Sequence, residues 1–218
     1  MSCADALQAA VFDMDGTLLE SMHIWKTAGV EYLAALGIEA EPDLHSRIKH
    51  LDMADTARYF QKVYRVPLSV PELVEGMNRH IDHQYLQVLQ LKAGAADFLR
   101  RLKERGVKLC LATATDRYMA EGALKRCGVL SLFDGFLTCS EVGRGKHDPA
   151  IFEAALRCLG TERSATWVFE DSLYAVRTAK AAGFPVAVVD DVYSHGDRAE
   201  LKALANQYLY QYSDFRME

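Results

Sequence analysis

The stretch Val11-Phe12-Asp13-Met14-Asp15-Gly16-Thr17 places two carboxylates and a glycine directly after a run of apolar residues. The run at 9–13 is short and continuous, which predicts a buried strand whose carboxyl end borders a site. Because side chains alternate along a strand, Asp13 and Asp15 should point the same way, and Gly16 allows a sharp turn. Such a carboxylate pair predicts a hard divalent cation, although two turn-forming aspartates would give the same heptapeptide.

The residues beyond this stretch predict the fold class. Between about 18 and 90, apolar residues recur at helical spacing, and three prolines divide the stretch into three or four helices. Beyond Gly94, helices and strands alternate, with strands expected at 107–113, 135–138, 165–169 and 185–189. This alternation predicts an α/β fold with a doubly wound parallel sheet, a Rossmann-like core that binds ligands at the carboxyl ends of its strands.

Two domains are therefore expected. Residues 1–19 and 91–218 form the catalytic core, and an all-helical cap domain occupies 20–90. The tail with Tyr208, Tyr210 and Tyr212 is interpreted as a last helix, in which the tyrosines serve packing.

The composition excludes several classes of protein. The 218 residues are 50% hydrophobic and 25% charged, as in ordinary globular proteins, and the net charge is -5 with scattered basic residues. Neither a nucleic-acid nor a membrane partner is expected, because a basic patch and a run of about 20 apolar residues are both missing. The N-terminus lacks signal-peptide features and the five cysteines form no paired motif. A cytoplasmic protein with reduced thiols and a small-molecule partner is expected.

Three later stretches add polar residues at predicted strand ends or in the loops beyond them. Glu170 and Asp171 end an apolar strand and form a second place for a metal, although Asp171 could simply cap the next helix. The hydroxyl of Thr113 and the amide of Ala114 could meet phosphate oxygens at a helix entrance, although such a threonine is usually a turn residue. Lys146 lies in a loop before a helix, where an ammonium could offset the repulsion between phosphate and a negative nucleophile. A solvated surface lysine is the alternative.

In the order Asp-x-Asp-Gly-Thr, Thr, Lys and Glu-Asp, these elements resemble the haloacid dehalogenase superfamily of phosphohydrolases, in its branch with a helical cap after the first motif. The likeness covers nearly the whole chain. It implies Asp13 as nucleophile and metal ligand, and Asp15 as general acid and base with its backbone carbonyl on Mg²⁺. It also implies Asp171 as the third protein ligand, with Glu170 supporting the metal from nearby.

The resemblance assigns the remaining residues to the phosphate group. Thr113 with the amide of Ala114 would hold the transferring phosphoryl group. Lys146 would neutralise charge and orient the nucleophile. Gly16 and Thr17 would complete the phosphate-binding first loop.

The same resemblance implies the chemistry. Asp13 would form an aspartyl-phosphate while Asp15 protonates the departing alcohol and later deprotonates the water that hydrolyses the intermediate. Members that cleave carbon–halogen bonds differ at the position of Asp15, so phosphate esters are favoured. The leading hypothesis is a Mg²⁺-dependent phosphatase acting on a small phosphorylated metabolite.

Two alternatives stay open. A sugar phosphomutase of the β-phosphoglucomutase type would share the core residues, but Lys49-His50-Leu51-Asp52-Met53 lacks the glycine and arginine expected in the cap loop of such a mutase. A phospho-acceptor signalling module without turnover would also use clustered aspartates, a lysine and Mg²⁺, but its phosphorylated aspartate follows a later strand. The sequence indicates neither the oligomeric state nor the particular ester.

Three residues depart from the family pattern: Glu20, His147 and Ala175 stand where an aspartate, a proline and a glycine are common. None of these changes removes a catalytic atom. His147 adds a titratable group next to Lys146, so an influence on the pH profile is expected.

The cap should supply contacts to the substrate, with candidates at Trp25, Arg47, Lys49 and His50. His80 and His83 are spaced like metal ligands, but a solvated helix face in a charged stretch explains them better. No metal is assigned to them.

Overall fold

The computed structural model describes residues 7–48, 51 and 53–217. The chain folds into two compact units, of which one is Met22–Val88 and the other joins the residues before and after that segment. The sequence predicts boundaries after residues 19 and 90, and the roles of catalytic core and cap stay predictions.

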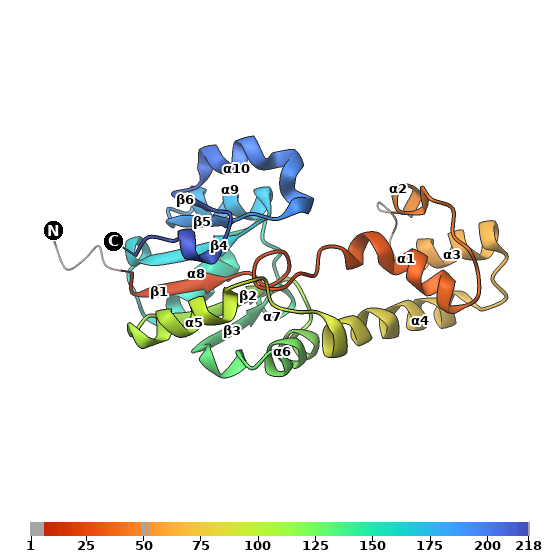
Figure 1. The fold of residues 1–218 in the computed structure, drawn as a ribbon, viewed down its shortest axis with the longest axis horizontal. Coiled ribbons are helices and arrows are strands. Elements are labelled where there is room, and N and C mark those ends of the chain that lie inside the picture. Colours follow the sequence, from red (N-terminus) through yellow and green to blue (C-terminus); the bar gives the residue numbers. More distant parts are fainter. Residues whose placement is uncertain (1–6, 49–50, 52, 218) are drawn as a thin grey trace. The chain divides into compact units, whose positions relative to one another are not determined.

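The larger unit is built on a six-stranded sheet in which all neighbouring strands are parallel. The strand order is β3-β2-β1-β4-β5-β6, so the first strand lies in the interior of the sheet (Figure 1). This topology confirms the predicted doubly wound α/β fold. The strands are β1 (Ala9–Phe12), β2 (Lys108–Thr113), β3 (Gly135–Thr138), β4 (Thr166–Glu170), β5 (Val186–Val189) and β6 (Gln207–Leu209).

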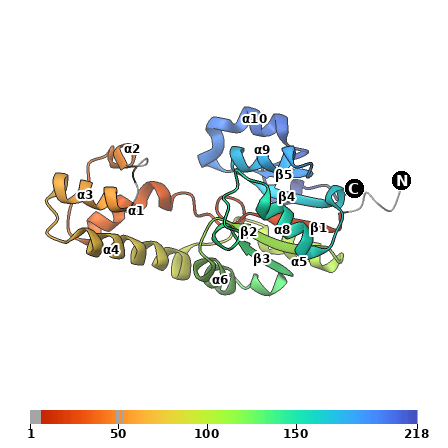
Figure 2. The same ribbon diagram turned by 180° about the vertical axis from the view of Figure 1, so that it is seen from behind.

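Helices cover both faces of this sheet (Figures 1 and 2). They are α5 (Ala95–Glu104), α6 (Arg117–Arg126), α7 (Cys139–Val142), α8 (Ala150–Leu159), α9 (Leu173–Ala181) and α10 (Arg198–Leu204). On one face, Phe12 stacks on Phe169 with ring centroids 4.4 Å apart, and Phe98 of α5 packs against both. On the other face, Val11 shares an apolar cluster with Ile151 of α8. Because β1 is buried on both faces, all of its residues are apolar.

The register of the sheet brings the predicted site residues to one edge. Phe12 pairs with Leu111 of β2 and with Phe169 of β4, and the amide of Asp13 donates to the Phe169 carbonyl at 3.0 Å. The residues that follow these strands therefore lie together at the carboxyl edge. This is the edge at which open α/β sheets bind ligands.

The C-terminal tail is not the last helix that the sequence predicts. Gln207–Leu209 forms strand β6 at the edge of the sheet, and Tyr212–Asp214 forms a 3₁₀ turn. Tyr208 and Tyr210 are two residues apart, so on an extended chain both rings project to one side, where their centroids lie 5.3 Å apart. Leu209 between them is buried. The period of two fits a strand, and a helical interpretation of the tyrosines was wrong.

In the described part of Met22–Val88, the regular elements are helices. They are α1 (Ile24–Ala35), α2 (Leu44–Ile48), α3 (Met53–Tyr64), α4 (Val70–His83) and a π-helical turn at Gln84–Val88. Side chains of α1, α3 and α4 form a separate apolar core, which includes Tyr32, Leu33, Phe60, Leu73 and Met77. Ser69 begins α4 through a reciprocal capping box with Glu72, and Pro71 lies in its first turn as predicted.

Across residues 7–48, 51 and 53–217, none of the helices combines the length and apolar character that crossing a membrane requires. The described cysteines, Cys110, Cys127, Cys139 and Cys158, are free thiols. The cytoplasmic location stays a prediction.

Candidate active site

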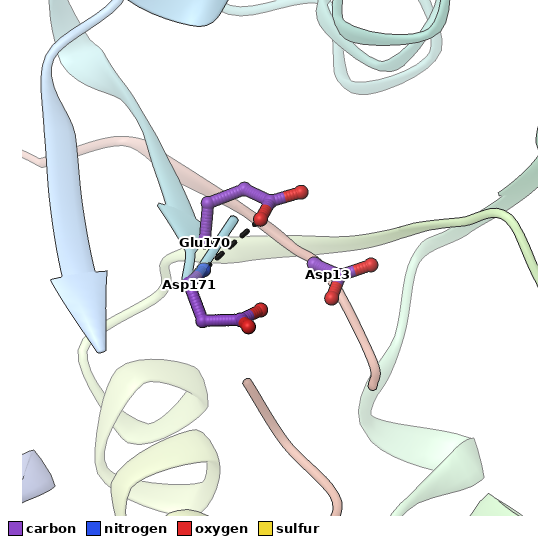
Figure 3. A group of neighbouring side chains, drawn as sticks. All are labelled: Asp13, Glu170 and Asp171. Atoms are coloured by element: carbon purple, nitrogen blue, oxygen red, sulfur yellow. Dashed lines mark hydrogen bonds between the residues drawn. The ribbon is translucent and has the colours of Figure 1, made fainter. Parts of the chain in front are cut away.

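Three buried carboxylates meet at the carboxyl edge of the sheet (Figure 3). Asp13 follows β1, Glu170 is the last residue of β4, and Asp171 comes next. One carboxylate oxygen of each residue lies within 4.8 Å of the other two. Because β1 and β4 are neighbouring parallel strands, their ends bring together side chains that are far apart in the sequence.

Lys146 supplies positive charge to this cluster. It lies in the loop between α7 and α8, and its side chain is 2% exposed. Its ammonium donates to Asp13 Oδ1 and, at 2.7 Å, to Glu170 Oε1. Burial acts against the charged form, but the charges of the two carboxylates outweigh it and raise the pKa of Lys146 above its ordinary value. Lys146 is therefore a buried ammonium rather than a solvated surface lysine.

If all three carboxylates were ionised, they would carry more negative charge than one lysine balances. Burial raises the pKa of Asp13 to about 7, with Glu170 and Asp15 adding to the effect and Lys146 opposing it. Burial and the charges of Glu170 and Asp13 hold the pKa of Asp171 well above its usual range. Three hard oxygen donors around one point, whose ionisation is unfavourable without a further positive charge, fit a divalent cation.

Two residues of the first loop contact Asp171: Gly16 leaves room for its carboxylate, and Thr17 bonds it. Gly16 has a φ of +79°, and a Cβ atom at this residue would lie 2.5 Å from Asp171 Oδ2. The buried hydroxyl of Thr17 donates to Asp171 Oδ1 at 3.0 Å, and the Thr17 carbonyl accepts from the Tyr212 hydroxyl at 2.7 Å. Gly16 is thus required for the turn and for the close approach of Asp171. Phosphate binding by Gly16 and Thr17 stays a prediction.

Glu170 has partners on both of its carboxylate oxygens. Oε1 accepts from Lys146, while Oε2 accepts from the backbone amides of Asp171 and Ser172 at 2.9 and 3.0 Å. These amides lie just before α9, whose N-cap residue Ser172 makes no side-chain capping bond. Glu170 therefore accepts from the N-cap amide and the amide before it, while the Asp171 carboxylate bonds Thr17.

Asp15 bonds a residue that none of the quoted motifs contains. The hydroxyl of Thr115 donates to Asp15 Oδ2 at 2.5 Å, and the Thr115 amide donates to Thr113 Oγ1 at 3.1 Å. The Thr115 bond places the loop after β2 beside Asp15, with Thr113 buried and Ala114 exposed in that stretch. Thr115 carries the same sequence signal as Thr113, a hydroxyl just beyond a strand end.

Two other residues near the cluster carry no sequence signal. Ser194 donates to Asp171 Oδ2 at 3.2 Å, and Lys92 forms an ion pair with the buried Asp191 at 2.7 Å. Both lie outside every motif: Ser194 contacts the cluster through the conformation of its loop, and Lys92 contacts Asp191 rather than the cluster itself.

The three departures from the family pattern lie in different surroundings. His147 is exposed and its ring stacks on Tyr174 with centroids 4.4 Å apart. Ala175 is buried in α9, and Glu20 Oε2 lies 3.7 Å from Lys92 Nζ. The influence of His147 on the pH profile stays a prediction.

The cap residues expected to contact substrate are only partly described. Trp25 is exposed, which suits a contact residue, whereas Arg47 pairs with Asp43 at 2.9 Å. Lys49 and His50 lie outside the described residues. Substrate contacts by this set stay predictions.

His80 and His83 lie on α4. His80 Nε2 lies 2.9 Å from Glu31 Oε2, and His83 is exposed. Among the described residues, the acidic cluster at the sheet edge, by contrast, is the group that brings three candidate metal ligands together.

Comparison with known proteins gives concordant matches. The model of the haloacid dehalogenase-like hydrolase family matches residues 7–183. Phosphorylated carbohydrates phosphatase of Thermotoga maritima is 27% identical over 177 residues, which cover 81% of this chain and 82% of that protein. Validoxylamine A 7'-phosphate phosphatase of Streptomyces hygroscopicus subsp. limoneus is 31% identical over 180 residues, with the same two coverages of 81% and 82%.

Among solved structures, the "putative beta-phosphoglucomutase from Thermotoga maritima" matches with a TM-score of 0.80 and 26% identity, covering 93% of this chain and 94% of that one. The relatives named as phosphatases support the predicted enzyme class, a phosphoric monoester hydrolase. The family match spans well over half of the chain. The chain therefore belongs to the haloacid dehalogenase-like hydrolase family, as its motifs predict.

Proposed function

We propose that this enzyme is a Mg²⁺-dependent phosphatase that hydrolyses a small phosphorylated, carbohydrate-like metabolite through an aspartyl-phosphate on Asp13. The observation that carries the proposal is the buried contact of the Lys146 ammonium with Asp13, beside Glu170 and Asp171. Relatives named for phosphorylated carbohydrates and for validoxylamine A 7'-phosphate support the substrate class.

Asp13 is the nucleophile of the proposed reaction. Lys146 orients its carboxylate and offsets its repulsion from the phosphate group. A bond forms between a carboxylate oxygen of Asp13 and phosphorus, while the bond between phosphorus and the ester oxygen breaks. The hydroxyl of Thr113 and the amide of Ala114 hold the phosphoryl oxygens at the end of β2.

Asp15 moves the protons. It gives a proton to the departing ester oxygen in the first step and takes a proton from the attacking water in the second. The water oxygen bonds to phosphorus, the bond between Asp13 and phosphorus breaks, and inorganic phosphate leaves. Thr115 holds Asp15 at the loop after β2, so the acid and base stays next to the proposed phosphate site.

The acidic cluster would hold Mg²⁺ through the carboxylates of Asp13 and Asp171 and the backbone carbonyl of Asp15, with Glu170 supporting it from the side of Lys146. The bound cation supplies positive charge that stabilises the negative phosphoryl oxygens. The chain keeps its carboxylates buried and close together, which makes the cluster unfavourable without a cation.

A sugar phosphomutase is the second candidate, because a solved structure described as a β-phosphoglucomutase shares this fold over most of both chains. A mutase would pass the phosphoryl group from Asp13 to a sugar hydroxyl instead of to water. The stretch 49–53 lacks the glycine and arginine expected of such a mutase, which favours hydrolysis.

The test is phosphate release from a panel of sugar, polyol and nucleoside monophosphates with Mg²⁺. We expect turnover of at least one ester, and loss of turnover with EDTA and in Asp13→Asn. Asp97→Asn removes an exposed carboxylate of α5 and serves as the matched control that keeps its activity. An inactive wild type, or an equally active Asp13→Asn, contradicts the proposal. Conversion of β-glucose 1-phosphate into glucose 6-phosphate without phosphate release establishes the mutase instead.

A further inference from the structure

We propose that Ser194, held by Asp191 and Lys92, positions the Asp171 carboxylate for binding of the divalent cation. This inference rests on the proposed function, because it concerns a ligand of the same cation. Ser194 lies in the 3₁₀ segment Val192–Asp197, which connects β5 to α10.

Each carboxylate oxygen of Asp171 accepts a hydrogen bond from a hydroxyl group. Ser194 Oγ donates to Oδ2 at 3.2 Å, and Thr17 Oγ1 donates to Oδ1 at 3.0 Å. Asp171 is fully buried, and the missing Cβ of Gly16 leaves the space that Oδ2 needs. Two hydrogen-bond donors from separate segments restrict rotation of the carboxylate group. The lone pairs that accept no hydrogen bond therefore keep a fixed orientation toward a cation.

Asp191 holds the turn that carries Ser194. Its Oδ1 accepts from the amide of Tyr193 at 2.8 Å, and its carbonyl accepts from the amide of Ser194 at 3.0 Å. Aspartate side chains commonly bond the backbone two residues on and thereby set a turn. Without this side chain, the Tyr193 amide loses the bond, and the turn that carries Ser194 keeps only its backbone bond.

Lys92 balances the charge of Asp191. Its ammonium lies 2.7 Å from Asp191 Oδ2 and 3.3 Å from the Asp190 carbonyl, with the two charged side chains 10% and 2% exposed. Its amide donates to the Leu18 carbonyl at 2.8 Å, which ties Lys92 to the first loop. Asp191 is close enough to Asp171 for their charges to interact, so an unpaired Asp191 would add a like charge beside the cluster.

Ser194 acts through Asp171, which makes it a positioning residue. A carboxylate with a fixed direction binds a cation without first losing rotational freedom. Loss of such an outer hydrogen bond typically weakens metal affinity by about 10- to 100-fold. A serine that served packing alone would change the melting temperature of the metal-free protein and leave the metal affinity unchanged.

The test is the Mg²⁺ dissociation constant of the metal-free full chain, measured by calorimetric titration without substrate. We expect Ser194→Ala to raise this constant by about 10- to 100-fold, with the metal-free melting temperature unchanged. Ser194→Thr keeps the hydroxyl, and Ser194 lines an open cavity of about 330 Å³, so near-normal affinity is expected. Ser213→Ala, at an exposed serine, is the matched control.

A double variant tests whether Asp191 acts through Ser194. Asp191→Ala alone should weaken Mg²⁺ binding by a similar factor, and the double variant should be no weaker than either single one, because both remove the same contact. If the losses of Mg²⁺ affinity in the two single variants add up in the double variant, Asp191 does not act through Ser194. Unchanged affinity in Ser194→Ala, or a Ser194→Thr as weak as Ser194→Ala, overturns the role of the hydroxyl and leaves the phosphatase proposal standing. A wild type that binds no Mg²⁺ overturns both.

Discussion

The hydroxyl of Thr115 donates to Asp15 Oδ2 at 2.5 Å, which fixes the proposed acid and base to the loop after β2. Thr115→Val removes this donor while keeping the shape of the side chain. We expect kcat to fall about tenfold with little change in KM, because proton transfer depends on the direction of Asp15 whereas substrate binding does not. Thr115→Ser should recover most of the loss. Steady-state kinetics with p-nitrophenyl phosphate provide the measurement, and a fully active Thr115→Val would show that the contact is not used.

Gly16 leaves no room for a side chain beside Asp171. Gly16→Ala places a Cβ 2.5 Å from Asp171 Oδ2 in addition to the strain of a positive φ, so we expect activity to fall by at least about 100-fold. Gly106→Ala is the matched control, because Gly106 also has a positive φ but nothing within 4 Å of its Cβ position. It should lose about 1 kcal/mol of stability and keep its activity. Equal losses of activity in the two variants would contradict the role of the close approach.

Mg²⁺ binding should be linked to pH through Asp13. Burial, with the nearby carboxylates, raises the pKa of Asp13 in the metal-free protein to about 7 from an ordinary 3.8, so in weakly acidic solution a proton must leave before the cation binds. A raised folded-state pKa stabilises the metal-free protein at low pH, and this stabilisation is lost as the pH rises from about 4 to about 7. Mg²⁺ should therefore bind more tightly, and raise Tm more, above pH 7 than below pH 6. Thermal melts with and without MgCl₂ check this, and Asp13→Asn should flatten the dependence.

Lys92 neutralises a buried carboxylate. Lys92→Met leaves Asp191 unpaired, so we expect the free energy of unfolding to fall by about 3 kcal/mol at neutral pH. Lys92→Met combined with Asp191→Asn should recover part of this loss, because the second change removes the uncompensated charge. Denaturant unfolding measures both. A single variant as stable as the wild type would indicate that the pair is effectively solvated.

The position of the acidic cluster follows from the strand ends in the sequence, whereas Lys146 lies in a loop between helices and its place beside the cluster was expected only from the family resemblance. A parallel sheet gathers its strand ends at one edge, so Asp13, Glu170 and Asp171 are brought together once the strands are recognised. Gly16 was also predictable, because a sharp turn after a strand requires a residue that tolerates a positive φ. The catalytic roles of these residues stay predictions.

Loop contacts could not be predicted in the same way. The bonds of Ser194 to Asp171 and of Thr115 to Asp15 depend on how irregular segments fold back, and no residue period encodes that path. The prediction of a helix for the tyrosine tail is wrong for another reason: its three tyrosines recur every two residues, which is the period of a strand. Edge strands of three residues carry too little pattern to outweigh such an assignment.

The covalent role of Asp13 is tested most directly by trapping the enzyme during turnover. Enzyme mixed with Mg²⁺ and p-nitrophenyl phosphate is quenched in acid within one turnover, digested and mapped by mass spectrometry. We expect one added phosphoryl group on the peptide that contains Asp13, located on that aspartate, and no such group in Asp13→Asn. Efficient phosphate release with Asp13 unmodified at every quench time, or with the phosphoryl group on another residue, would contradict Asp13 as the nucleophile.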